Sequence, residues 1–249
     1  TFHITRDLGK AISCLARIET DASRKRSLLN ESAKLIEQSI DILKQASAVS
    51  LVEPREENLM AILWVLATYQ VELANTEENV DAKIKTLENA ITSMQSARES
   101  FLKWIKTPWA RVEKPLWFLI GENERKTGKT LNQLYALTSN RIFLGDGVEA
   151  FERSVDAYDK ADAPSRVAEA YWQIAKTYTQ LADYFESAKN FESASKNYRL
   201  AAEKMPQLKG FYMGYSSYMQ AWGEIEKARE CHTKEEYSRA KEYYENAAS

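Results

Sequence analysis

The residues with the greatest capacity for chemistry in this 249-residue sequence are two cysteines and two histidines. Cys231 and His232 are neighbours, but adjacent residues on a helix point about 100° apart, so the histidine would not reach the thiol as a base. A metal site needs three or four ligands at suitable spacing, and His3 and Cys14 lie far from this pair along the chain. The sequence therefore predicts no catalytic residue, no metal and no cofactor.

Residues Thr127 to Thr130 contain Gly-Lys-Thr, the last part of a phosphate-binding loop. That loop also needs a glycine five residues before Gly128, where Asn123 stands, and an apolar β-strand in front of it, which is absent from the sequence pattern. We interpret the segment as a turn at a helix boundary.

The charge balance gives no global reason to expect nucleic acid or an anionic membrane as a partner, since the net charge is −2. Residues 103–145 are a local exception, because basic side chains outnumber acidic ones and interleave with Trp104, Trp109 and Trp117. Such a segment is typical of an insert anchored by tryptophans, of a protein contact, or of a polyanion-binding surface. The three interpretations stay open, in that order of preference.

Glycine and proline are scarce, at 8 and 5 residues, although β-sheet proteins need frequent turns that contain them. This scarcity favours long helices. The longest apolar run, Leu59 to Ala67, has nine residues, whereas a membrane-spanning helix needs about 20. Cys14 and Cys231 match no zinc or redox spacing, so we expect reduced thiols in a cytoplasmic protein without membrane insertion.

Prolines and polar clusters divide the chain into helical stretches, with Gly145-Asp146-Gly147 as a tight turn between two of them. The expected stretches are 4–22, 24–48, 54–75, 79–106, 109–125, 128–144, 147–161, 164–187, 189–204, 207–232 and 234–248.

A side-chain pattern recurs along these stretches, in which a large apolar residue is followed by a small one at +3, a large one at +7 and a small one at +10. These spacings place all four residues on one helical face. Alternation of large and small residues is typical of closely packed neighbouring helices. The five instances are Ile36/Ser39/Leu43/Ala46, Leu87/Ala90/Met94/Ala97, Phe151/Ser154/Tyr158/Ala161, Phe191/Ala194/Tyr198/Ala201 and Tyr237/Ala240/Tyr244/Ala247.

Between Ala175 and Pro206 the chain resembles the tetratricopeptide repeat family. The first helix would carry the family's aromatic, leucine, small and aromatic residues, and the second its alanine, aromatic, alanine and closing proline. The matching residues are Tyr178, Leu181, Ala182, Phe185, Ala194, Tyr198, Ala201 and Pro206. Instances of the pattern are more widely spaced than the family's 34 residues. A related stack of long helices, similar to the SNAP adaptor proteins, is a structural alternative.

The resemblance implies a right-handed superhelix of antiparallel hairpins, whose first helices line a concave groove that holds a peptide or a partner's helix. Carried over by position, the groove residues are Lys176, Thr179, Asp183 and Glu186 in one hairpin and Gln220, Gly223, Lys227 and Glu230 in the next. Thr179 and Asp183 occupy two positions of the family's carboxylate clamp, so binding of a chaperone tail is disfavoured.

The segment from Phe211 to Trp222 is the densest aromatic region of the chain, and Phe211, Tyr215, Tyr218 and Trp222 fall on one stripe. The stripe would pack the last hairpin onto the one before. It would alternatively serve as a contact surface, since tyrosine and tryptophan combine a large apolar area with a polar tip.

We therefore expect an all-α protein, an α-solenoid of long antiparallel helical hairpins. Its parts would be N-terminal hairpins over 1–106, an inserted basic and aromatic element over 107–126, and hairpins resembling tetratricopeptide repeats over 127–249. The expected function is that of a non-catalytic scaffold or adaptor that binds a protein or peptide, and self-association stays open. Alternatives are a regulatory or sensor domain of a larger protein, compatible with the start at Thr1, and an α-helical enzyme or ligand-binding protein.

Overall fold

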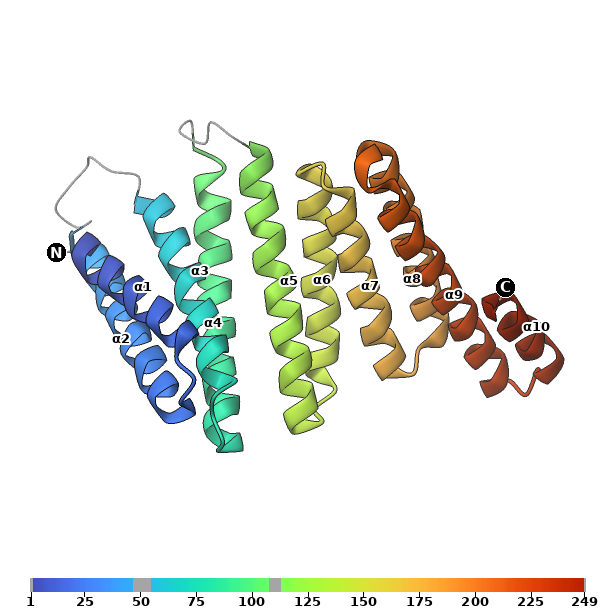
Figure 1. The fold of residues 1–249 in the computed structure, drawn as a ribbon, viewed down its shortest axis with the longest axis horizontal. Coiled ribbons are helices and arrows are strands. Elements are labelled where there is room, and N and C mark those ends of the chain that lie inside the picture. The colour runs from blue at the N-terminus through green and yellow to red at the C-terminus, as the bar shows by residue number, and fades with distance from the viewer. Residues whose placement is uncertain (1, 47–54, 108–112, 249) are drawn as a thin grey trace. The chain divides into compact units, whose positions relative to one another are not determined.

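The computed structural model describes residues 2–46, 55–107 and 113–248, and within these ranges the chain forms ten α-helices, one 3₁₀ turn and no β-strand (Figure 1). The all-α class predicted from the sequence is confirmed. The helices are α1 Phe2–Ile18, α2 Ala22–Ala46, α3 Arg55–Ala74, α4 Val80–Trp104, α5 Glu113–Thr138, α6 Ile142–Lys160, α7 Pro164–Leu181, α8 Tyr184–Lys204, α9 Lys209–Thr233 and α10 Tyr237–Ala248, with the 3₁₀ turn at Pro206–Leu208.

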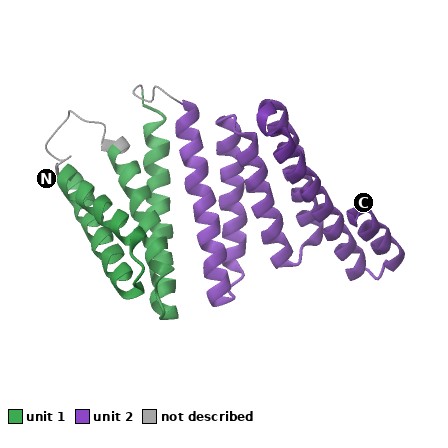
Figure 2. Cartoon of the chain, in the orientation of Figure 1, with its two compact units in different colours: residues 1–111 green, residues 112–249 purple. Residues whose placement is uncertain are grey.

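The chain divides into two compact units, Thr1–Arg111 with α1 to α4 and Val112–Ser249 with α5 to α10 (Figure 2). Inside each unit a helix packs mainly on the helices directly before and after it in the sequence. This nearest-neighbour packing of antiparallel hairpins is the arrangement of a helical-repeat, solenoid-like fold.

The structure corrects the expected boundaries in the middle of the chain. The stretches 109–125 and 128–144 are not separate helices, because α5 runs without a break from Glu113 to Thr138. The expected boundary of an insert at residue 126 therefore falls inside α5, while residues 108–112 lie outside the described part of the chain. The turn follows α5 at Ser139, whose φ of 55° is left-handed, and Gly145 to Gly147 are helical residues of α6.

Two glycines of α5, Gly128 in the phosphate-loop-like segment and Gly121 seven residues before it, face aromatic rings on α6. A β-carbon on Gly128 would meet the Phe151 ring of α6 at 2.7 Å, and one on Gly121 would meet the Tyr158 ring at 2.6 Å. The glycines therefore serve as notches for the rings of the facing helix. Their role is close packing, and the Gly-Lys-Thr sequence is neither a turn nor a phosphate loop.

The recurring large and small residues form much of the core. Ala90, Ala194 and Ala240 are all buried, and so are the large members of the instances on α4, α6 and α8. The instance on α10 is different, because Tyr237 and Tyr244 are exposed at the last helix of the stack.

A second correction concerns the hairpin that carries the family resemblance. The first helix ends at Leu181 rather than at 187, since Ala182 adopts a left-handed φ of 61° and the Asp183 side chain caps the next helix by accepting from the Glu186 amide. Phe185, expected on the first helix, lies in the first turn of α8 and is exposed. In the part of the chain that the structure describes, no helix has both the length and the apolar character needed to cross a membrane.

Candidate functional site

Five aromatic side chains form a continuous surface on α7 and α9, which we name the aromatic surface: Trp172, Phe211, Tyr215, Tyr218 and Trp222. Four of them recur every three or four residues along α9, so they share one helical face. The Trp172 ring of α7 lies 6.3 Å from the Tyr215 ring and 6.4 Å from the Tyr218 ring, the latter edge to face. The stripe predicted from the sequence therefore exists and gains a fifth ring from α7.

The aromatic surface is partly core and partly exposed. On its inner side, Trp222 stacks on Phe191 with ring centres 6.0 Å apart, and Tyr215 packs 5.3 Å from the buried Tyr198. On its outer side, Phe211 keeps 57% and Tyr218 keeps 49% of its area accessible. Both interpretations of the stripe are thus compatible with the packing, since inner edges anchor it and outer edges remain accessible.

An open hollow of about 330 Å³ lies beside these rings, between α7 and α9. Its lining combines the buried rings of Tyr198 and Tyr212 with hydroxyl and charged groups from the first turns of α7. The lining residues are Ser165, Arg166, Glu169, Trp172, Tyr198, Phe211, Tyr212 and Tyr215. Aromatic walls with a few polar groups are typical of a recognition site.

The polar edge of the hollow belongs to a network of charged groups that joins α5, α6 and α7. Glu169 accepts from Arg166 at 2.7 Å and lies 3.5 Å from Arg125, which also binds Glu122 at 2.7 Å. The Tyr158 hydroxyl donates to Glu122 at 2.6 Å. Mutual pairing fixes these side chains before any ligand arrives, which lowers the entropic cost of binding against them.

Electrostatics in the network favour an ionised Glu122 and a protonated Tyr158 phenol. Burial alone would raise the pKa of Glu122, but hydrogen bonds from Arg125 and Tyr158 outweigh it, so the pKa of Glu122 lies below its ordinary value. Burial, together with the hydrogen bond to Glu122, raises the pKa of Tyr158. Glu122 is thus held as the charged partner of Arg125, and Tyr158 as its hydrogen-bond donor.

Cations also lie over the two tryptophans of the aromatic surface, Trp172 and Trp222. The Lys176 ammonium is 5.9 Å from the centre of the Trp172 ring, and the Arg229 guanidinium is 6.0 Å from the Trp222 ring. Such contacts place positive charge along both sides of the aromatic surface. Lys176 is exposed, so its charge is accessible to a partner.

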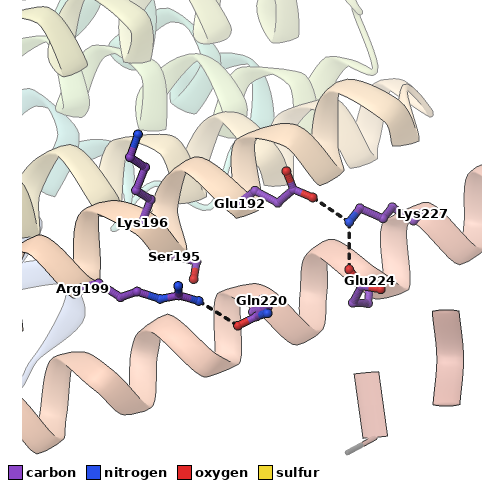
Figure 3. Close-up of a pocket in the computed structure, with 7 residues that line it drawn as sticks. All are labelled: Glu192, Ser195, Lys196, Arg199, Gln220, Glu224 and Lys227. Atoms are coloured by element: carbon purple, nitrogen blue, oxygen red, sulfur yellow. Dashed lines mark hydrogen bonds and ion pairs between the residues drawn. The ribbon is translucent and has the colours of Figure 1, made fainter. Parts of the chain in front are cut away.

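A second hollow, of about 200 Å³, lies between α8 and α9 and contains two of the groove residues expected from the resemblance, Gln220 and Lys227 (Figure 3). The Lys227 ammonium is 2.6 Å from Glu192 and 2.8 Å from Glu224, while Arg199 donates to Gln220 at 3.0 Å. Burial would lower the pKa of Lys227, but its two carboxylate partners raise it. These groups pair with one another across the two helices, so they brace α9 on α8.

The other expected groove residues have local structural contacts. Thr179 bonds Ser187 at 2.8 Å between α7 and α8, and Asp183 caps α8. Glu186 pairs with Lys189, and Glu230 with Lys234. The structure therefore brings Lys176 to the aromatic surface, Gln220 and Lys227 to the second hollow, and Lys227 and Glu230 to a further hollow formed by α8, α9 and α10, while Gly223 is buried.

Sequence reasoning missed Trp172, Arg166 and Glu169. Trp172 follows Tyr171, which belongs to the core-facing stripe of α7, and the extra tryptophan next to that stripe was the signal available in the sequence. The sequence contains no signal for Arg166 and Glu169, because their place in the charged network depends on ion pairs with residues of α5 that lie 40 or more residues away along the chain.

Among the described residues no group of three or more His, Cys, Asp or Glu side chains is arranged to hold a metal ion. Both cysteines are free, with Cys14 exposed and Cys231 buried.

No protein-family model and no curated protein matches the chain. Similar solved structures include a de novo designed 16-helix transmembrane nanopore, at 16% identity over 99% of this chain and 89% of that one, with a TM-score of 0.46. A circular tandem repeat protein matches at 18% identity over 99% of this chain and 58% of its own, with a TM-score of 0.38. BtubC from P. vanneervenii matches at 13% identity over 100% of this chain and 90% of its own, with a TM-score of 0.35. The helical-repeat class itself rests on the helices of this chain.

Proposed function

We propose that this chain is a non-catalytic protein-interaction module that binds an apolar segment of a partner, a helix or an extended peptide, on the aromatic surface of α7 and α9. The observation that carries the proposal is the exposure of Phe211 and Tyr218 on a surface whose inner edges are fixed in the core. Rigid, partly exposed aromatic side chains bind with little loss of rotamer entropy, and tyrosine and tryptophan dominate binding energy at interfaces.

The surrounding charges support a partner whose apolar anchors are accompanied by acidic residues. Lys176 is exposed beside Trp172, whereas the carboxylate of Glu169 is neutralised by Arg166 and Arg125. A partner would therefore meet the positive charge of Lys176 rather than the negative charge of Glu169. The resemblance of α7 and α8 to a tetratricopeptide hairpin also supports peptide binding. As part of the same proposal, the hairpins would stack into the right-handed superhelix of that family.

A peptide-display selection against the whole chain tests the proposal. We expect the selected peptides to contain aromatic or aliphatic anchors next to acidic residues, and to lose at least tenfold in affinity for Phe211→Ser or Tyr218→Ser. Ile142→Ser on α6 is the matched control, because Ile142 is also a large, exposed apolar residue. Peptides that bind all three variants alike would contradict the proposed site.

A further inference from the structure

The first helix distributes its side chains in an unusual way. The residues of α1 that are buried against the rest of its unit are small, namely Gly9, Ser13 and Ala16. Phe2 and Ile12 are half-buried, whereas its four other large apolar residues face solvent, with exposed fractions of 73% for Ile4, 50% for Leu8, 54% for Leu15 and 77% for Ile18. A helix stabilised only by packing inside its own chain would show the opposite distribution, because large apolar side chains gain most from burial.

These exposed residues form a continuous line, which we name the α1 stripe: Ile4, Leu8, Ala11, Leu15 and Ile18. The spacing along the chain is four, three, four and three residues, the repeat of a coiled-coil seam. No charged residue interrupts the line. The face is therefore built to pack against another helix in the manner of knobs into holes.

The order of residues in the stripe identifies that helix. Isoleucine, leucine, alanine, leucine and isoleucine form the same series in either direction, centred on Ala11. Such a series suits an interface between two identical copies, because under a twofold axis residue i of one copy meets residue j of the other, and residue j of the first meets residue i of the second. With the axis at Ala11, Ile4 meets Ile18 of the second copy, since each lies seven residues from Ala11, and the small Ala11 side chains let the helices approach closely. Leu8 and Leu15 lie three and four residues from Ala11, so they meet with an offset of one residue, about 1.5 Å along the helix.

We propose that the α1 stripe is a homodimer interface, in which the α1 helices of two copies of this chain pack antiparallel about a twofold axis at Ala11. The 17 residues of α1 make a contact roughly 25 Å long and about one helix diameter wide. Such a contact removes on the order of 1,000 Å² of accessible surface from the two copies, at the lower end of specific interfaces. The dimer should accordingly have a Kd in the micromolar range.

Sedimentation equilibrium of the whole chain between about 1 and 200 µM tests the dimer directly, because this range brackets a micromolar Kd. We expect the mean mass to rise from one copy to two. Leu8→Glu should raise the Kd about 100-fold or more, because it places a carboxylate against an apolar partner residue. Ile142→Glu on α6 is the matched control and should leave the Kd unchanged, since Ile142 is also a large, exposed apolar residue but lies outside the stripe.

Direction is tested by a charge swap. Leu15→Lys alone should weaken the dimer, whereas Leu8→Glu and Leu15→Lys combined in one chain should restore much of the affinity, because antiparallel packing places the two substituted residues opposite each other. In a parallel dimer like charges would face each other and the combined variant would stay monomeric. Ala11→Cys on a Cys14→Ser background should form a disulfide between copies under mild oxidation, because residue 11 lies on the axis.

A protein that stays monomeric over this concentration range overturns the proposal and assigns the stripe to a helix of different sequence. A dimer that tolerates Leu8→Glu also overturns it. Because α1 belongs to the first unit and the aromatic surface to the second, peptide binding and self-association fail or succeed independently.

Discussion

Gly128 and Phe151 are so close that a β-carbon at residue 128 would lie 2.7 Å from the ring. Seven residues earlier on α5, Gly121 has the same relation to Tyr158, which is seven residues later on α6. Two notches on one helix therefore face two rings on its antiparallel neighbour. The Ser154 hydroxyl between the rings donates to the Gly121 carbonyl at 3.0 Å, which fixes the register of the hairpin.

Replacing Gly128 by alanine should lower the free energy of unfolding by about 1–3 kcal/mol, because the added methyl group forces the Phe151 ring out of its buried position. The loss appears although alanine is the better helix former. Urea denaturation of the purified chain, followed by circular dichroism at 222 nm, measures it.

Gly145→Ala is the matched control for this substitution. Gly145 lies in α6 with nothing within 4 Å of its added β-carbon, and no glycine that the structure describes has a positive φ. Alanine there should stabilise the chain by about 0.5–1 kcal/mol. If Gly128→Ala stabilised the chain as much as Gly145→Ala, the notch would have no energetic role.

The ion pairs Arg125–Glu122 and Arg239–Glu236 have the same spacing and nearly the same length, 2.7 and 2.6 Å, but differ in burial. Both side chains of the first pair are 13% exposed, against 63% and 37% in the second. Arg125→Met should therefore cost about 3 kcal/mol, since it leaves the buried Glu122 with only the more distant cation of Arg166, 3.7 Å away. Arg239→Met should cost less than about 0.5 kcal/mol. Equal losses in urea denaturation would show that the network around Arg125 is no more than a surface pair.

Glu226 makes the stability of the second unit depend on pH. Its carboxyl is fully buried, and although Oε1 accepts from Arg229 at 2.7 Å, Oε2 has no hydrogen-bond partner. Burial raises the pKa of Glu226 above its ordinary value of 4.5, with Arg229 and Thr179 opposing the change. The folded chain thus holds this proton more tightly than the unfolded chain, and the resulting stability is complete below pH 4.5 and is lost as the pH rises through the raised pKa.

Glu226→Gln removes the cost of burying the charge but keeps the shape of the side chain. The variant should gain stability relative to the wild type at pH 7, and the gain should be smaller at pH 4. The quantity compared is the free energy of unfolding of the variant minus that of the wild type. Glu230→Gln serves as the control, because Glu230 is only half-buried and pairs with Lys234. A difference between Glu226→Gln and wild type that is independent of pH would contradict a raised pKa.

The helices could be predicted from the sequence because their signals are local. Spacing placed Phe151, Ser154 and Tyr158 on one face, and all three are buried. The errors arose where a local signal had a non-local cause. The segment around Gly128 has the residue types of a turn, but a glycine is needed there because the Phe151 ring of the facing helix approaches it closely. The end of α7 at Leu181 depends on Ala182, which adopts a left-handed conformation that alanine rarely prefers.

The site could be predicted only in part, for a related reason. The stripe from Phe211 to Trp222 is visible in the sequence because its period lies within one helix. The contribution of Trp172 and the charges at Glu169 depend on how α7 packs beside α9 and α5, which single-helix periodicity does not contain. The hydrogen bond between Thr179, one of the family positions, and Ser187 on the next helix is another contact that the pattern of a single helix does not contain.

Tyr212 and Tyr218 lie six residues apart on α9 and should separate stability from binding. Tyr212 is 9% exposed and packs on Tyr198, so Tyr212→Ala should lower the unfolding free energy by about 3 kcal/mol or more. Tyr218 is 49% exposed, so Tyr218→Ala should cost less than about 1 kcal/mol while weakening a selected peptide at least tenfold, measured by fluorescence anisotropy. If Tyr218→Ala instead lost stability as Tyr212→Ala does, the outer ring would be part of the core, and its accessibility would no longer argue for a binding surface.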